Sequence, residues 1–162
     1  MISNSAEARK ARVGGKLRQF IGLSAGVKAQ ALQAAFWLPL VHWRLKRSGL
    51  QSCLRWLGAE ADGGGPASAF DARRYAQARE CGRGVALASG YGLVAGTCLS
   101  RSLTIMRLLA RRKIAARLRV GVRLDDGALK AHAWVEVAGV PLEPGQAGHA
   151  AFPGFDTAFG PP

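Results

Sequence analysis

Apolar and polar residues are arranged so that the first part of the chain favours helices and the last part favours strands. Apolar residues recur at helical spacing over residues 16–38 and again over residues 40–57. Pro39 separates these stretches, and proline ends or kinks a helix because it lacks an amide hydrogen. The pattern therefore predicts two helices that meet at Pro39, with Gly58 as the stop signal of the second.

A glycine-rich break follows over residues 59–66, where three consecutive glycines and a proline favour a loop or linker. A third helix is expected to start near Ser68, which can cap a helix, and to run to about Cys81 or Ala88. Two glycines weaken its second half. The tryptophans before the break are expected in the core or at helix contacts: Trp37, Trp43 and Trp56.

A fourth helix is predicted from Cys98 to about Arg112, with Thr97 as a suitable N-cap. Its apolar residues form a stripe that should face the core. The stripe comprises Leu99, Leu103, Met106 and Ala110, with Leu109 beside it.

The remaining pattern is that of a small antiparallel sheet. Alternating residues predict strands over 116–124 and 129–137, and a short third strand over 140–143. Asp-Asp-Gly at 125–127 and Ala-Gly at 138–139 are turn signals between them. From Pro144 onwards the chain is expected to form a surface loop. The elements together predict an α+β fold in which one helix packs on a small sheet.

These elements suggest three regions in one compact unit. Residues 1–15 are expected to be a basic flexible tail, and residues 16–66 an N-terminal helical region with its glycine-rich linker. Residues 67–162 are expected to form the core with a C-terminal loop segment. A chain of 162 residues with 49% hydrophobic residues is large enough to bury such a core.

The chain is strongly basic, with a formal net charge of +13. Such a charge is typical of proteins that bind nucleic acid or an anionic surface. However, most of the basic residues are arginines spread over the whole sequence, so no arm or patch marks a nucleic-acid site. An acidic protein or peptide partner is at least as consistent with this pattern, and nucleic acid is not expected as the main ligand.

The cysteines and the hydropathy of the chain argue against metal-binding, secreted and membrane-spanning classes of protein. The three cysteines have no metal-binding spacing and no disulfide framework, so neither a metal nor another cofactor is expected, and a reducing cytoplasm fits. The N-terminus lacks the apolar segment of a signal peptide. The longest uncharged apolar stretch, residues 29–41, is too short to span a bilayer, which takes about 20 residues. Contact of this stretch with a membrane surface or a partner is left open.

Two residues carry the clearest chemical signal. Cys98 starts the fourth helix, where the helix dipole and free amide groups favour a thiolate. His132 lies on the second strand, where an imidazole could take and return the proton of a thiol. If the helix packs on the His132 face of the strand, the two groups can meet. Glu143 follows the next turn and could orient the imidazole, as in hydrolases with a nucleophile, a base and an acid.

The same residues resemble a known family. The run Cys98-Leu-Ser-Arg-Ser-Leu, the run Ala131-His-Ala-Trp-Val-Glu, and the strand between them resemble the transglutaminase-like cysteine proteases of lasso peptide biosynthesis. The resemblance is specific from about Gly96 to Glu143 and looser in the N-terminal helices. It implies a papain- or transglutaminase-like core in which Cys98 is the nucleophile and His132 the general base and acid.

The resemblance leaves the acidic residue open between Glu143 and Glu136. Glu143 is the better match, because Glu136 lies on the same strand as His132, about 13 Å away. No glutamine is evident as an oxyanion donor, so the backbone amide of Cys98 is expected to contribute. Arg101 is expected to face solvent, and Cys53 and Cys81 to be core or bystander thiols.

The family implies that the enzyme cleaves the leader from a ribosomal precursor peptide through a thioester. The family also implies an asparagine-synthetase-like cyclase as partner. Longer members carry a leader-binding domain at the N-terminus, so the short helical region here implies a separate leader-recognition protein. Two alternatives stay open: an acyl transferase that passes the thioester to an amine, and a basic binding module without catalysis. Reactivity of Cys98 with iodoacetamide would separate an enzyme from a binding module.

Overall fold

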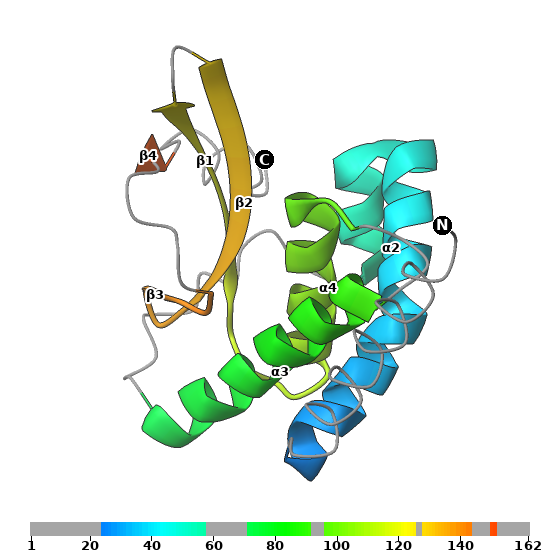
Figure 1. Cartoon of the computed structure of the whole chain (residues 1–162), viewed down its shortest axis with the longest axis vertical. Helices are drawn as coiled ribbons and strands as arrows, with labels where there is room; N and C mark the ends of the chain where they lie inside the picture. Colours follow the sequence, from blue (N-terminus) through cyan, green and yellow to red (C-terminus); the bar gives the residue numbers. More distant parts are fainter. Residues whose placement is uncertain (1–23, 58–70, 92–95, 126–127, 144–149, 152–162) are drawn as a thin grey trace, which may run out of the picture.

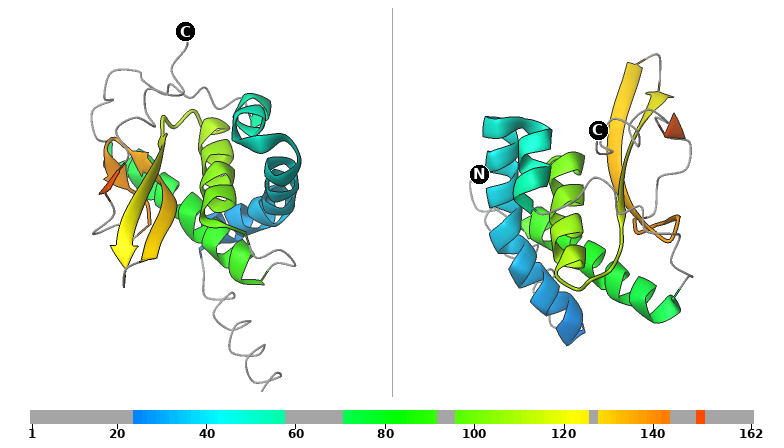
Figure 2. Two further views of the ribbon diagram at one scale, coloured as in Figure 1. Left: turned by 90° about the horizontal axis from the view of Figure 1, so that it is seen from above. Right: turned by 180° about the vertical axis from the view of Figure 1, so that it is seen from behind.

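The computed structural model describes residues 24–57, 71–91, 96–125, 128–143 and 150–151. The described residues form three helices and a four-stranded antiparallel sheet, which confirms the expected α+β fold. In Figures 1 and 2, α4 lies between the sheet and α2, and α3 crosses beside them. The bounds are α2 (Ala25–Leu57), α3 (Ala72–Tyr91), α4 (Cys98–Ala110), β1 (Arg117–Asp125), β2 (Ala128–Val137), β3 (Val140–Pro141) and β4 (Ala150–Ala151).

The break in the first helical segment lies at Gly49, and the predicted break at Pro39 is wrong. Helix α2 continues through Pro39, whereas Gly49 leaves helical geometry with φ 73° and ψ 175°. A positive φ costs glycine little, because glycine has no Cβ. Proline removes one helical hydrogen bond, but Pro39 and Ala35 are both exposed, so water can solvate the freed carbonyl. The buried neighbours Leu38 and Val41 hold the helix in place.

Helix α3 begins later and ends later than expected. Its cap is Asp71, whose Oδ1 accepts hydrogen bonds from the amides of Arg73 and Arg74. The predicted cap Ser68 lies outside the described residues. The glycines expected to weaken the helix lie within it, and Gly84 permits close approach to α2. A Cβ at Gly84 would lie 2.4 Å from the Cβ of Gln30.

Helix α4 is buried on more than one side. Thr97 caps it as predicted, since its side chain accepts a hydrogen bond from the amide of Ser100 at 3.2 Å. The predicted stripe is only partly correct, because Ala110 is exposed and two apolar residues outside it, Ile105 and Leu108, are fully buried, as is Leu109 beside it. Leu103 packs with α2, whereas the others pack with α3 and the sheet: Ile105, Leu108 and Leu109. The helix is buried more widely because helices and sheet cover it from different directions.

The sheet has the order β3-β2-β1-β4. Strands β1 and β2 pair along their whole length, and Gly121 lies opposite His132 in the register. β3 pairs only with Glu136 and Val137 of β2. β4, which was expected to be part of a surface loop, pairs with Gly121 and Val122 of β1. A two-residue strand of alanines carries no alternating pattern that sequence reasoning could detect.

The tryptophans of α2 differ in environment. Trp37 is half-buried and packs against Trp56 across the Gly49 break, with ring centroids 5.9 Å apart. The guanidinium group of Arg107 lies 4.9 Å from the centroid of the Trp37 ring. Trp43, by contrast, is 56% exposed, so the expected core or helix contact is wrong for this residue.

Candidate active site

Cys98 is the first residue of α4 and is half-buried. The first helical hydrogen bond of the turn runs from the amide of Arg101 to the carbonyl of Thr97. The amides of Cys98 and Leu99 precede that bond, so they are free by position to point at a negative charge. This end of the helix can therefore donate hydrogen bonds to an oxyanion.

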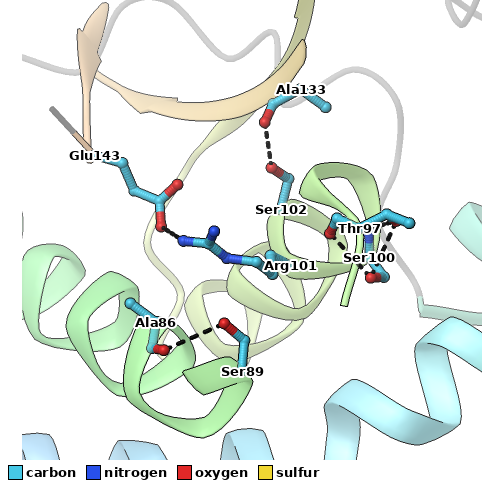
Figure 3. A network of polar contacts seen from close by, with 8 residues as sticks. All are labelled: Ala86, Ser89, Thr97, Ser100, Arg101, Ser102, Ala133 and Glu143. Carbon is cyan, nitrogen blue, oxygen red and sulfur yellow. Dashed lines mark hydrogen bonds and ion pairs between the residues drawn. The ribbon is translucent and has the colours of Figure 1, made fainter. Parts of the chain in front are cut away.

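The side of α4 that carries Cys98 contacts the sheet through the next turn. The Ser102 hydroxyl donates a hydrogen bond to the buried carbonyl of Ala133 at 3.0 Å. The Arg101 guanidinium donates to Glu143 Oε1 at 2.6 Å, as Figure 3 shows. Residues three and four apart share one face of a helix. Cys98 therefore lies on the helix face that meets β2 and the segment after β3.

The contact is made at the edge of β2. The carbonyl of Val135 accepts a hydrogen bond from Leu142, so it points towards the β3 side. Carbonyls two residues apart on a strand point the same way, which places the carbonyl of Ala133 at that edge as well. Among the described residues β3 does not reach this point, and Ser102 takes the position of a neighbouring strand. The start of α4 is thus fixed beside His132 and Ala133.

His132 lies on the other face of β2 from the body of α4. Val135 and Val137 pack with α4 in the core, whereas His132 alternates with them along the strand. The helix therefore does not pack on the His132 face. Packing on that face was the condition under which Cys98 and His132 were expected to meet. Helix and strand meet instead at the edge, which both faces of β2 share. The ring of His132 is stacked on Trp134, with centroids 6.2 Å apart and planes 15° apart.

Glu143 follows β3 and lies near His132, but not directly opposite it. The bond between Leu142 and Val135 continues the β2–β3 register, so Glu143 comes opposite Trp134, two residues from His132. Its side chain is 19% exposed. The expectation that Arg101 faces solvent is wrong, because its guanidinium pairs with this carboxylate. Arg101 and Ser102 were missed as site residues, although their spacing from Cys98 places them on its helix face.

Glu136 has a different set of partners. Its Oε1 accepts a hydrogen bond from the indole of Trp134 at 2.9 Å, and its Oε2 accepts one from Arg119 at 3.0 Å. Both carboxylate oxygens are therefore engaged in a bridge between β1 and β2. This arrangement suits a structural role for Glu136. The sequence predicts the same role, because Glu136 lies too far along the strand from His132.

The other two cysteines are in the core. Cys53 and Cys81 are fully buried, and burial raises the pKa of both thiols, because an apolar surrounding disfavours the charged thiolate. The Cys81 thiol lies 3.7 Å from the Gln30 side-chain oxygen. Of the three thiols, the half-buried Cys98 is the one accessible to a substrate.

The described part of the chain contains no cluster of three or more His, Cys, Asp or Glu side chains able to hold a metal ion. None of its helices is long and apolar enough to span a bilayer. His42 lies half-buried on α2, far along the chain from the site, and His149 falls outside the described residues.

Comparison with known proteins agrees with this arrangement. The profile of the transglutaminase-like superfamily matches residues 35–154, which is most of the chain. The chain belongs to the transglutaminase-like superfamily. The helix that begins with Cys98 and packs on an antiparallel sheet is its transglutaminase-like core, and the superfamily includes cysteine proteases. No curated protein and no solved structure matched the chain.

Proposed function

We propose that this transglutaminase-like protein is a cysteine peptidase that removes the leader from a ribosomally made precursor peptide, in the manner of lasso peptide maturation. The observation that carries the proposal is the position of Cys98. It starts a capped helix whose next turn is bonded to the edge of β2 beside His132. The family membership and the resemblance of both motifs to leader peptidases support the same conclusion.

The reaction follows from these groups. The Cys98 thiolate attacks the carbonyl at the leader–core junction, and the amides at the start of α4 stabilise the oxyanion. The C–N bond breaks, the core leaves as an amine that takes a proton from His132, and the leader remains as a thioester on Cys98. His132 then removes a proton from water, which attacks the thioester and releases the leader acid.

Glu143 is proposed as the acid that orients His132. The bond from Arg101 keeps its carboxylate beside β2, at the same edge of the sheet as the start of α4. A carboxylate there stabilises the imidazolium that forms during acylation. Glu136 is less suitable, because Arg119 and Trp134 hold its two oxygens.

The proposed partners come from the resemblance. They are the precursor peptide, a separate leader-recognition protein and an asparagine-synthetase-like cyclase that closes the ring after cleavage. The proposed location is the cytoplasm, where such precursors are made. The net charge of +13 supports an acidic peptide or protein as partner.

The proposal is tested by cleavage of the precursor with and without the leader-recognition protein. Cys98→Ala is expected to lower the rate by about a thousandfold or more, because it removes the nucleophile. Cys53→Ala is the matched control, since it removes a buried thiol and should lower stability but leave cleavage. Undiminished cleavage by Cys98→Ala would contradict the proposal.

The mass of the product separates peptidase from transferase. Hydrolysis gives a free leader acid and a free core amine, whose masses together exceed that of the precursor by one water. An acyl transferase would join the leader carbonyl to an added amine. A product of that kind, formed in preference to hydrolysis, would favour the alternative.

A further inference from the structure

A row of exposed apolar residues runs along the outer face of α2. The residues are spaced alternately four and three apart, so they lie on one side of the helix. The row spans about 27 Å at 1.5 Å per residue and lies before the break at Gly49. Its large members are Leu32 at 71% exposed, Phe36 at 65% and Trp43 at 56%. The row comprises Ala25, Ala29, Leu32, Phe36, Pro39 and Trp43, all of them exposed.

The charged side chains of α2 itself are all basic, although the carboxylate of Glu80 in α3 lies against α2 at Gly26, near the Ala25 end of the row. Helix α2 contains no Asp or Glu, whereas it contains Lys28, Arg44, Lys46, Arg47 and Arg55. Lys46 and Arg47 are exposed and follow the row at its tryptophan end. The Arg47 guanidinium lies 5.7 Å from the centroid of the Trp43 ring. The row thus has leucine and phenylalanine in its middle and an arginine–tryptophan pair at one end.

We propose that α2 binds an anionic lipid surface through this row. Helices that lie in the membrane interface place leucine and phenylalanine among the acyl chains, with tryptophan and basic residues at the headgroups. From Leu32 to Trp43 the row has no carboxylate on its own helix that would repel acidic lipids. A second copy of the chain is a poorer occupant, because pairing two α2 helices would bring like charges together.

The position of α2 leaves the active site open to substrate. In Figures 1 and 2, α2 lies on the opposite side of α4 from β2. The residues of the row are exposed, whereas Leu38 and Val41 on the same helix are buried. Attachment through α2 would therefore leave the edge of β2 and the start of α4 facing away from the lipid. The proposal does not depend on the reaction that Cys98 performs.

Co-sedimentation with lipid vesicles tests this proposal. The full chain is mixed with vesicles of phosphatidylcholine containing about 30% phosphatidylglycerol, or with vesicles of phosphatidylcholine alone. Binding is expected to the first and to be weak with the second. The triple variant Leu32→Gln/Phe36→Gln/Trp43→Gln is expected to reduce binding by at least about tenfold, because it removes the inserted groups.

Leu124 and Leu129 provide the matched control. Both are 70% exposed, but they lie on the β1–β2 hairpin, so Leu124→Gln/Leu129→Gln should bind as the wild type does. Circular dichroism confirms that both variants fold. Absence of wild-type binding, or equal binding by the α2 variant and the wild type, would overturn the proposal. The latter result would indicate adsorption by charge alone.

Tryptophan fluorescence gives a second test, which detects insertion of Trp43 directly and does not depend on a variant that binds less well. Insertion of Trp43 should shift emission to the blue when anionic vesicles are added, and brominated lipids should quench it. Trp43→Phe should lose most of this response, whereas Trp56→Phe should keep it, because Trp56 packs against Trp37 and Arg44. A response carried by Trp56 alone would contradict docking through the row.

Discussion

At the residue scale, Glu136 and Glu143 differ in their hydrogen-bond partners, and these partners indicate different roles. The carboxylate of Glu143 is held by Arg101 from α4, whereas that of Glu136 is held by Arg119 and Trp134 within the sheet. The first carboxylate is thereby bonded to the helix that begins with Cys98. The second stabilises the β1–β2 pair. The two side chains are chemically the same, and their different partners agree with the sequence argument that separated them by distance from His132.

The two glutamates should therefore respond differently to the same substitution. Glu143→Gln is expected to lower kcat/KM by about tenfold or more, because it removes the charge that we propose orients His132. Its effect on unfolding should be small, since the Arg101 pair is partly exposed. Glu136→Gln should instead lower the free energy of unfolding by about 1–3 kcal/mol and leave much of the activity. Cleavage kinetics and urea denaturation of both variants measure this, and the reverse pattern would make Glu136 the acid.

At the element scale, α2 and α3 are held together by backbone contact at one glycine. A Cβ on Gly84 would lie 2.8 Å from the carbonyl carbon of Gln30 and 2.9 Å from the amide of Ala31. Gly82, two residues earlier in α3, has its nearest neighbour at 4.0 Å, in Leu142. The same helix thus contains one glycine required by packing and one that is not.

Alanine at these positions should change stability in opposite directions. Gly84→Ala is expected to lower the free energy of unfolding by about 1–3 kcal/mol, because α2 must move away. Gly82→Ala should raise it by about 0.5–1 kcal/mol, since alanine is the better helix former and has room. Thermal or urea unfolding of both variants checks the contrast. Equal effects would show that the two helices do not approach at Gly84.

Sequence reasoning was most successful where the determinants are local. The Thr97 cap, the β1–β2 hairpin and the turn at Ala138 and Gly139 depend on a few neighbouring residues, and the structure confirms them. The break at Gly49 was missed because Pro39 is the stronger local signal for a helix end. Packing of α2 overrides the signal of Pro39, and the helix continues through it. The Arg101–Glu143 pair joins residues far apart in sequence, so no local pattern reveals it.

At the scale of the whole molecule, the site depends on where helix and sheet meet. The sequence predicted an α4 that packs on the sheet, but it could not tell which face of β2 the helix would cover. In the structure the helix body covers the Val135 face and its first turns reach the edge of β2 through Ser102. If Cys98 and His132 act on one substrate, as proposed, the substrate must approach at this edge. The triad itself remains a prediction from motif, position and family.

The central claim is that Cys98 carries the leader as a thioester, and an acid-quenched reaction tests it most directly. Wild-type protein is mixed with the precursor peptide, quenched during the first turnover, and its intact mass is measured. The account predicts a mass increase equal to the leader acid minus one water, mapped to Cys98 by peptide sequencing and lost when hydroxylamine is added. Cleavage that proceeds with no adduct at any time, or with an adduct on another residue, would contradict it.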